Sequence, residues 1–595
     1  MRPAFNFGRA GVFVGLVWIL AGGPSPEAAR AALQHESAAE NQKDRPRMDL
    51  VLRPVVNAAS QVTDVEVSTT IRLGVEPANA PFTLKIPVVF GGVRGIADGV
   101  KDLVVGGESG AVRLDQTDDA PDASGFVYYR RWQAAQPIRG TIAAKYRYHL
   151  ATPHPNPGPP FDLRPNGGGV SGAGAGFLLL PDDKRVFDVH LSWDLGNMKA
   201  GSQGASSLGN GDVQVQVPME ALLASFFMAG PLKRYPADGG ADGFSAAWIG
   251  TPPFNAEEVM ARSAKAYSAL CSFFQDSNPP PFRVFMREGP DNVSEGGAAL
   301  TNSFMLFLPT DANLTRNVDG VIAHEMVHHF VGSLEGTPGL ISWYGEGLAE
   351  YYSRVQMFRV GLLSIPQFLD MINRKAVQYY TNPLINLPND QVPKYFWTTR
   401  NAQIVPYDRG FFYFVDVNAK LRTVTKGKVS LDDLVLSMID RQRHGKEPTQ
   451  QTWLETVEAV LGASALKEFE SVMVEGHTLV ADSEAFGRCF ERRPVELRTF
   501  EVGFDERASL YIPPRLIHGL IKGSAAEAAG LRNDDEVLEP VDLDALRSNP
   551  DMKAKLKIRR GKKVMEIEYL PRGKKVQGYE WVRIPHVTDA QCRIM

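Results

Sequence analysis

His324 and His328 constrain the fold of this chain more than any other feature of its sequence. Residues four apart lie on one face of an α-helix, so their two imidazoles can bind one metal ion if this segment is helical. Asp319 is placed to cap the N-terminus of that helix. Apolar residues around the pair have the spacing of a buried helix, namely Val321, Ile322, Met326, Val327, Phe330 and Val331.

Carboxylates complete a candidate metal site. Glu325 follows the first histidine, where its side chain can reach a water on a metal without binding the metal itself, which is the place of a general base. Catalytic zinc takes three protein ligands, and two histidines with one glutamate is a known set. A second predicted helix, from near Ser342, carries Glu346 and Glu350 one turn apart, and either carboxylate can face the metal. The alternative is a chance occurrence of the motif, with packed or solvated histidines.

Residues 324–334 and 346–352 resemble the gluzincin metallopeptidases, most closely the glycyl-aminopeptidase family that carries a C-terminal PDZ domain. The resemblance implies a thermolysin-like catalytic domain with one zinc ion per chain, held by His324, His328 and Glu346. The connector between His328 and Glu346 is one residue shorter than in the related alanyl-aminopeptidase group, and it is a loop rich in glycine. Glu350 is then not a ligand but a candidate to orient one of the two zinc-binding histidines.

Residues 405–412 resemble the Tyr-x-Lys/Arg-Gly segment of the same enzymes. The resemblance implies that the hydroxyl of Tyr407 helps to hold the oxyanion of the tetrahedral intermediate, since hydrolysis needs a donor for charge that develops in the transition state. The alternative is a tyrosine that packs at the start of a helix.

Residues 295–303 resemble the Gly-Gly-x-Glu-His-x-x-Ser segment of the family. The resemblance implies a strand edge that pairs with the substrate backbone, with Gly296, Gly297 and Ala298 as its residues. An ordinary glycine turn is the alternative. Ala299 replaces the glutamate that binds a free substrate amino group in family members, and Glu295 is the candidate substitute. Aminopeptidase and endopeptidase activity therefore both stay open.

A chain of 595 residues is too long for one hydrophobic core, which predicts a multidomain α+β fold. Residues 1–31 have a basic start, a short apolar run and small residues, as in a secretory signal peptide. An uncleaved membrane anchor is the alternative, but the run is shorter than the ~20 residues that span a bilayer. We therefore expect a secreted or periplasmic protein, membrane-anchored if the signal stays, with no other membrane span.

Residues 48–242 predict a β-sandwich-like domain, because segments such as 65–73, 82–90 and 186–193 show partial period-two patterns. Residues 153–176 are dense in proline and glycine, which predicts a long loop inside this domain, with a linker between domains as the alternative. Residues 243–485 are then the thermolysin-like catalytic domain with its helical half. Its predicted elements are an amphipathic helix over 254–274, a strand over 282–286, and helices that include 410–421 and 431–441.

Residues 488–575 resemble a PDZ domain. The resemblance rests on residues 516–538, where a strand, a small-residue helix, a Gly-Leu turn and an acidic pair follow one another, and on a closing hairpin over 556–567. It implies capture of a peptide carboxyl terminus by strand addition, although no clear carboxylate-binding loop precedes Leu516, and a structural role is the alternative. Residues 576–595 are predicted as a C-terminal tail.

Three cysteines, Cys271, Cys489 and Cys592, are too few for a disulfide framework. Cys489 and Cys592 flank the C-terminal domain and are candidates to pair in an oxidising compartment. Acidic and basic residues are interspersed, with a net charge of −4, so nothing indicates nucleic-acid binding.

The motifs favour a secreted zinc metallopeptidase that hydrolyses a peptide or protein substrate through a zinc-activated water. Two alternatives come from other classes of protein. One is a PDZ-based peptide-binding protein with an inert peptidase domain, and the other is a zinc hydrolase of a non-peptide substrate.

Overall fold

The computed structural model describes residues 45–74, 81–121, 127–150, 161–238, 243–288, 296–308, 318–396, 398–510 and 514–593. The chain divides into two compact units, Met1–Tyr267 with Asn278–Val318, and Ser268–Ser277 with Asp319–Met595. The predicted signal peptide and Glu295 lie outside the described residues. Within these described ranges, no helix has the length and apolar character needed to cross a bilayer.

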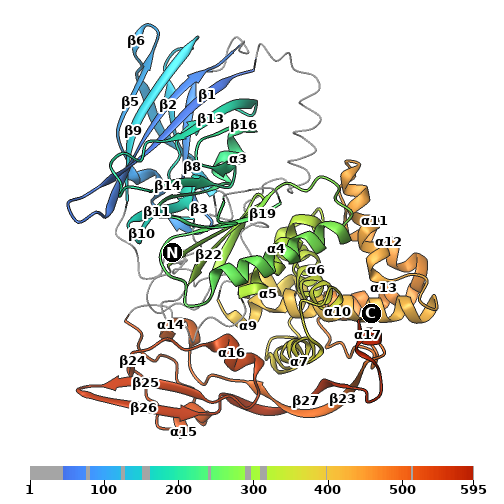
Figure 1. The fold of residues 1–595 in the computed structure, drawn as a ribbon. Coiled ribbons are helices and arrows are strands. Elements are labelled where there is room, and N and C mark those ends of the chain that lie inside the picture. Colours follow the sequence, from blue (N-terminus) through green and yellow to red (C-terminus); the bar gives the residue numbers. More distant parts are fainter. Residues whose placement is uncertain are drawn as a thin grey trace, which may run out of the picture. The chain divides into compact units, whose positions relative to one another are not determined.

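The first unit begins with a seven-stranded sheet, drawn in blue and cyan in Figure 1, which confirms a β-rich N-terminal region. Buried and exposed side chains alternate along its strands, so that one face packs into the core. All neighbouring strands are antiparallel except β1 and β13, which are parallel. Its strands, in sheet order, are β16 (Val213–Pro218), β13 (Val186–Trp193), β1 (Arg47–Val56), β2 (Val62–Arg72), β9 (Thr141–His149), β5 (Val100–Gly107) and β6 (Gly110–Ala111).

Two five-stranded sheets share a core with this first sheet. One contains β10 (Arg164–Asn166), β11 (Gly169–Ala173), β17 (Phe226–Gly230), β14 (Gln203–Ser206) and β15 (Gly209–Asn210). The other contains β12 (Leu180–Pro181), β3 (Thr83–Phe90), β8 (Val127–Ala134) and β7 (Leu114–Asp118), with β4 (Val93–Arg94) beside β3. The helical turns η1 (Ile96–Gly99), η2 (Gly174–Gly176) and α3 (Met219–Leu223) connect these strands.

The long loop predicted over residues 153–176 is wrong from residue 161 onward. That part contains β10, β11 and η2, and β11 and η2 are buried. Its glycines serve close packing, because a Cβ at Gly174 would lie 2.0 Å from the Leu222 carbonyl oxygen and one at Gly172 would lie 2.7 Å from that of Asp162. Residues 153–160 lie outside the described residues.

A fourth sheet of the first unit has the order β18 (Lys233–Tyr235), β19 (Phe244–Trp248), β20 (Phe282–Glu288), β22 (Ser303–Leu308) and β21 (Gly296–Leu300). Strands β19, β20 and β22 are parallel neighbours, and β21 is an antiparallel strand at the end of the order. Helix α4 (Ala256–Phe273) connects β19 to β20, as a crossover between parallel strands requires. The predicted helix over 254–274 and the predicted strand over 282–286 are both confirmed.

The second unit contains the helices drawn in yellow-green to orange in Figure 1. They are α5 (Val318–Val331), α6 (Pro338–Arg359), α7 (Ile365–Thr381), α8 (Val392–Phe396), α9 (Arg400–Gln403), α10 (Val405–Val424), α11 (Leu431–Arg443), α12 (Gln450–Leu461) and α13 (Ala463–Phe469), with the turns η4 (Asn389–Gln391) and η5 (Glu470–Val474). The predicted helices over 410–421 and 431–441 are confirmed within α10 and α11. Helix α6 begins at Pro338, before the predicted Ser342, because proline suits the first turn of a helix. Asp319 lies in the first turn of α5, not at its cap.

Helices α6 and α10 cross at two glycines. A Cβ added to Gly347 of α6 would lie 2.6 Å from the Cα of Gly410 on α10, which is closer than real Cβ atoms approach. The missing side chains therefore let the two backbones come into contact. This contact brings the middle of α6 against the first turns of α10.

The C-terminal module, residues 489–592, contains a core of its own within the second unit, formed by residues between Phe500 and Tyr569. It contains the antiparallel pair β23 (Phe490–Phe500) and β27 (Arg572–Arg583), and the sheet β24 (Glu536–Val537), β25 (Ala554–Arg560) and β26 (Lys563–Tyr569). Four short helices complete it, α14 (Glu506–Leu510), α15 (Ala525–Ala528), α16 (Leu543–Ser548) and α17 (Asp589–Cys592). The predicted hairpin is confirmed as β25 and β26, and the small-residue helix as α15.

The predicted tail over 576–595 is wrong for residues 576–583. These residues belong to β27, where Gly578 and the fully buried Trp581 face the protein interior. The predicted pairing of Cys489 with Cys592 is confirmed by a disulfide bond, which joins the two ends of the module. Cys271 is not part of a disulfide bond.

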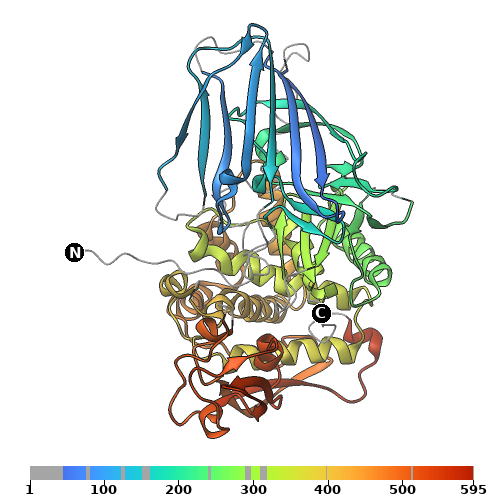
Figure 2. The ribbon, with the colours of Figure 1, turned by 90° about the vertical axis from the view of Figure 1, so that its left-hand side faces the viewer.

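The C-terminal module contacts α7 and α9 through hydrogen bonds and an ion pair. The Asn373 amide donates to the Trp581 carbonyl oxygen at 2.8 Å and accepts from the Trp581 backbone N–H at 2.7 Å. Arg400 of α9 pairs with Asp544 of α16 at 2.9 Å. Figure 2 shows this module in red beside the helices of its own unit. The module is therefore fixed to α7 and to the segment that leads into α10.

Candidate metal centre

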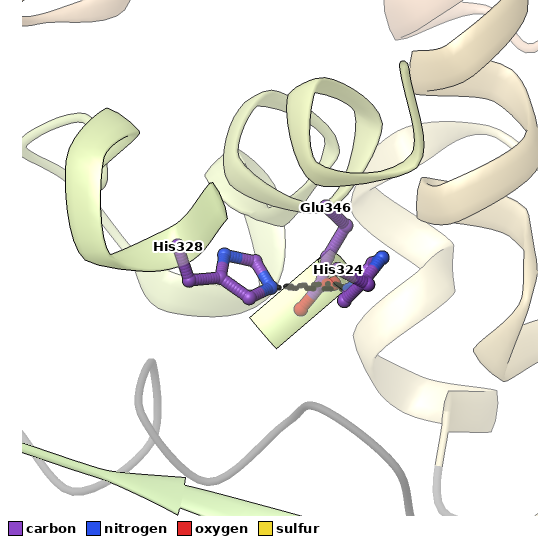
Figure 3. A group of neighbouring side chains, drawn as sticks. All are labelled: His324, His328 and Glu346. Atoms are coloured by element: carbon purple, nitrogen blue, oxygen red, sulfur yellow. Dashed lines mark hydrogen bonds and ion pairs between the residues drawn. The ribbon is translucent and has the colours of Figure 1, made fainter. Parts of the chain in front are cut away.

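Three potential metal ligands converge in the second unit. The Nε2 atom of His324 lies 3.2 Å from Nε2 of His328 and 3.2 Å from Oε2 of Glu346, and His328 Nε2 lies 3.3 Å from the same Oε2. Figure 3 shows the three side chains pointing toward one another from α5 and α6. The structure thus brings together the three residues that the sequence predicts as ligands, and the cluster is suited to hold a metal ion.

The local sequence explains how the two helices present these groups. His324 and His328 are one turn apart on α5, so both imidazoles leave the same face. Glu346 is completely buried on α6, between two glycines. A Cβ at Gly345 would lie 3.3 Å from the Gly332 carbonyl oxygen, so a larger residue would press against the end of α5. Small residues beside Glu346 therefore let α6 approach the histidines.

The donor set fits zinc. Zinc–ligand bonds of about 2.0–2.1 Å in a tetrahedral site place neighbouring ligand atoms roughly 3.3–3.4 Å apart, which agrees with the three separations above. Imidazole nitrogens and one carboxylate oxygen are ligands that zinc prefers. The second oxygen of Glu346, Oε1, is buried and has no hydrogen-bond partner among the described residues. A cation at this point would compensate a buried carboxylate that is otherwise incompletely paired.

Glu350, the other candidate ligand, lies on the opposite side of His324. Its Oε1 atom is 3.1 Å from Nδ1 of His324, away from the Nε2 atom that faces Glu346. Burial alone would raise the pKa of Glu350, but the charges of Arg354 and Lys375 hold that pKa well below its usual value. Glu350 is therefore an ionised carboxylate beside Nδ1 of His324, and Glu346 is the carboxylate that faces the donor cluster.

Glu325 is buried but unpaired. Its side chain is 2% exposed, and neither carboxylate oxygen has a hydrogen-bond partner among the residues described. Burial raises the pKa of Glu325, and the nearby His324 and His328 oppose that rise. A buried carboxylate without donors is costly, so its retention next to a metal-ligand cluster indicates a chemical role.

Tyr407 lies in the first turn of α10, with its ring stacked on that of His324. The ring centroids are 5.8 Å apart and the ring planes differ by 17°. Burial, together with the negative charge of Glu346, raises the pKa of Tyr407 well above its usual value. The phenol is therefore neutral at physiological pH and is able to donate a hydrogen bond.

One solved structure in particular shares this architecture. An aminopeptidase N family protein from Idiomarina loihiensis matches 92% of this chain and 100% of its own, with a TM-score of 0.62 at 14% identity. The fold is that of an aminopeptidase N family protein. An M1 zinc metallopeptidase from Deinococcus radiodurans covers 73% of this chain and 95% of its own, with a TM-score of 0.43 at 19% identity. Leukotriene A4 hydrolase from Saccharomyces cerevisiae covers 76% and 72%, with a TM-score of 0.42 at 15% identity.

No family model matches the sequence, and no curated protein matches it. The aminopeptidase N fold agrees with the multidomain α+β prediction, in which a β-rich N-terminal region precedes a helical part. The cluster of two histidines and one glutamate offers the donors for one zinc ion per chain.

The predicted substrate segment lies on β21 in the first unit. Gly297 and Ala298 pair with Leu306 and Met305 of β22, and Ala298 is buried. A Cβ at Gly297 would lie 2.2 Å from the ring of Phe304, so packing within the sheet already requires glycine at this position. The position of β21 at the end of the sheet agrees with a strand edge, and pairing of Gly296, Gly297 and Ala298 with substrate remains a prediction.

Sequence reasoning missed a buried charge network beside the metal centre. Nζ of Lys375 on α7 lies 2.5 Å from Oε2 of Glu350 and 2.5 Å from Oδ1 of Asp408 on α10. Burial raises the pKa of Asp408 to about 6, and Lys375 opposes that rise. The sequence does contain a signal, because Phe368, Ile372 and Tyr379 place Lys375 on the apolar face of an amphipathic helix. A lysine on such a face requires buried carboxylate partners.

Proposed function

We propose that this protein is a secreted zinc metallopeptidase of the gluzincin type that hydrolyses peptide bonds. The observation that carries the proposal is the convergence of His324, His328 and Glu346 within 3.3 Å of one another. The unpaired, buried carboxylate of Glu325 follows directly after one of these residues. Zinc bound by the three side chains would supply a Lewis acid and lower the pKa of a bound water toward neutrality.

Glu325 acts as the general base in this proposal. It accepts a proton from the attacking water and later gives that proton to the leaving amine, so peptide hydrolysis consumes one water and the carboxylate is regenerated. The raised pKa of Glu325 suits both transfers, because a base with a pKa nearer to neutrality also serves as an acid. The absence of described hydrogen-bond partners leaves its oxygens available for the water.

Tyr407 acts as the donor to the oxyanion. Its neutral phenol, stacked on His324, gives a hydrogen bond that strengthens as negative charge develops on the carbonyl oxygen. The stacking fixes the ring, so little reorganisation is needed when the charge appears. Glu350 positions His324 through its Nδ1 atom.

The proposed substrate is an extended peptide or protein segment. Ala299 on β21 offers no carboxylate for a free amino terminus, and Glu295 is the remaining candidate for that contact. We therefore propose that internal peptide bonds are cleaved at least as well as terminal ones. The sequence resemblance to the glycyl-aminopeptidase family supports the peptidase assignment. Ala299 departs from the pattern of that family, and this departure concerns the preference for free amino termini.

The C-terminal module is proposed to be a PDZ domain. Its support is the short helix α15, the strand β24 and the hairpin of β25 and β26, together with a core separate from that of the helices. A peptide carboxyl terminus is the proposed ligand. The Cys489–Cys592 disulfide supports an oxidising compartment, in agreement with the signal-like sequence of residues 1–31.

Zinc content and peptide turnover test the proposed function. We expect about one zinc per chain after dialysis against metal-free buffer, cleavage of an internally quenched peptide library, and loss of cleavage after chelation with recovery on adding zinc. A protein that holds zinc yet cleaves no library peptide, while it hydrolyses an ester or epoxide, would be the zinc hydrolase of a non-peptide substrate. A protein that holds no zinc but binds peptides would be the inert binding protein.

A further inference from the structure

Lys375 is a buried cation that joins two carboxylates from different helices. Its side chain is 6% exposed, and its Nζ atom lies 2.5 Å from both Glu350 Oε2 on α6 and Asp408 Oδ1 on α10. Both oxygens therefore lie within ion-pair distance of one ammonium group. Arg354 adds a further contact to Glu350 at 3.0 Å, and Gln378 adds one to Asp408 at 3.2 Å. The contacts therefore hold both carboxylates firmly.

The Glu350 branch of this network ends at a predicted metal ligand. Lys375 and Arg354 hold Oε2 of Glu350, and the other oxygen, Oε1, lies 3.1 Å from Nδ1 of His324. A carboxylate at Nδ1 favours the tautomer in which Nδ1 carries the proton. That tautomer leaves the lone pair of Nε2 for the metal. The position of Glu350 thus decides which nitrogen of His324 is available.

The Asp408 branch ends at the proposed oxyanion donor. Asp408 directly follows Tyr407 in the first turn of α10, and both its side chain and that of Lys375 are buried. Because Lys375 holds the carboxylate of Asp408, it also restrains the helical turn that presents the Tyr407 ring to His324. A single ammonium group is therefore linked to both sides of the metal centre.

We infer that Lys375 is a positioning residue, which holds Glu350 and Asp408 so that His324 and Tyr407 keep their orientation at the metal centre. The inference rests on the proposed function and assigns the zinc peptidase a group on α7, a helix outside its motifs. Lys375 reaches the reaction only through Glu350 and Asp408. Its replacement should therefore change metal binding and turnover, and leave the affinity for substrate nearly unchanged.

Metal affinity and the spectrum of a bound cobalt ion test this role. We expect Lys375→Met to lower zinc affinity, measured by competition with a chromogenic chelator, by roughly 10–100-fold, as is typical when a partner of a metal-ligating histidine is lost. The visible absorption of the Co²⁺-substituted protein should shift, and kcat should fall with little change in KM. Arg374→Met is the matched control, since Arg374 is the neighbouring residue of α7 and pairs with Asp370 on an exposed face. It should leave all four quantities unchanged.

A purely structural role predicts a different outcome. If Lys375→Met lowers thermal stability but keeps the zinc affinity and the Co²⁺ spectrum of the unchanged protein, the inference is wrong. Should this variant not fold, Lys375→Met with Asp408→Asn removes one charge of each sign and leaves Arg354 opposite Glu350. Zinc affinity equal to that of the unchanged protein in this double variant would also overturn the inference. Failure of the proposed function is distinguishable, because the zinc and cobalt measurements do not depend on peptide cleavage.

Discussion

Gly347 of α6 and Gly410 of α10 lie in direct contact, because a Cβ added to Gly410 would lie 2.8 Å from the Cα of Gly347 and 2.3 Å from the Trp343 carbonyl oxygen. Glu346 precedes the first glycine and Tyr407 lies one turn before the second. The contact thus sets the distance between the helix that carries a predicted metal ligand and the helix that carries the proposed oxyanion donor.

Gly410→Ala should destabilise the protein by about 1–3 kcal/mol, as overpacking does when the neighbouring atoms are backbone. If the two helices were not in contact, replacing glycine by alanine within a helix would instead stabilise the protein by up to ~1 kcal/mol. The sign of the change in unfolding free energy therefore tests the contact. Denaturant unfolding measures it. Gly106→Ala is the control, because a Cβ there would meet only the Gly110 carbonyl oxygen at 3.9 Å. If Gly410→Ala were as stable as the unchanged protein, α6 and α10 would be able to move apart at no cost, and the contact would not set their distance.

Glu346→Ala should lower the zinc content sharply, since two protein ligands hold zinc poorly compared with three. Metal analysis after dialysis measures the loss. Glu350→Ala serves as the comparison and should weaken zinc binding less, because Glu350 contacts the far nitrogen of His324. The ligand assignment is wrong if Glu346→Ala keeps its zinc while Glu350→Ala loses it.

Glu325→Gln should keep zinc and lose turnover by roughly two to four orders of magnitude, because the amide has the size of the carboxylate but cannot accept the proton. Zinc content and kcat are measured on the same preparation. Loss of zinc together with activity would instead indicate that Glu325 is a ligand.

Tyr407→Phe should lower kcat on the order of a hundredfold or more, as expected for removal of one oxyanion donor. The ring that stacks on His324 is retained in this variant, so zinc content and thermal stability should stay the same. Near-normal turnover would remove Tyr407 from the mechanism and leave it as a residue that packs against His324.

An acetylated peptide should be cleaved at least as fast as the same peptide with a free amino terminus. Binding a buried ammonium group calls for a carboxylate, and Ala299 provides none. Rates for the two peptides, measured side by side, decide between endopeptidase and aminopeptidase activity. Strict dependence on the free amine, abolished by Glu295→Gln, would restore the aminopeptidase interpretation.

The local parts of the metal centre were predictable from sequence. The four-residue spacing of His324 and His328 requires a helix, and the apolar positions around them indicate the buried face on which α5 packs. Period-two patterns likewise predicted β2, β3 and β13. Helix spacing alone left Glu346 and Glu350 as alternatives, and the family resemblance favoured Glu346. In the structure Glu346 is the carboxylate that lies beside His328.

Contacts between distant segments were less predictable. Strand β27 has charged residues and two glycines, and its pairing with β23 joins segments that are far apart in the chain. The glycines of residues 167–176 resembled a loop because sequence does not distinguish a turn from a place where two backbones touch. The partners of Lys375 on α6 and α10 likewise depend on how three helices pack.

The Cys489–Cys592 disulfide brings the two ends of the C-terminal module within 4.9 Å, measured between their Cα atoms. A domain whose ends adjoin can be lifted out and replaced without stretching the remaining chain. Because Phe500 pairs with Arg572, residues 501–571 also have adjoining ends, and this part, which holds most of the module's own core, is suited to exchange for an unrelated domain with neighbouring termini. Such a chimera would lose the contact of Asp544 with α9 and keep that of Trp581 with α7. It would show how far the stability of the helices depends on the native module.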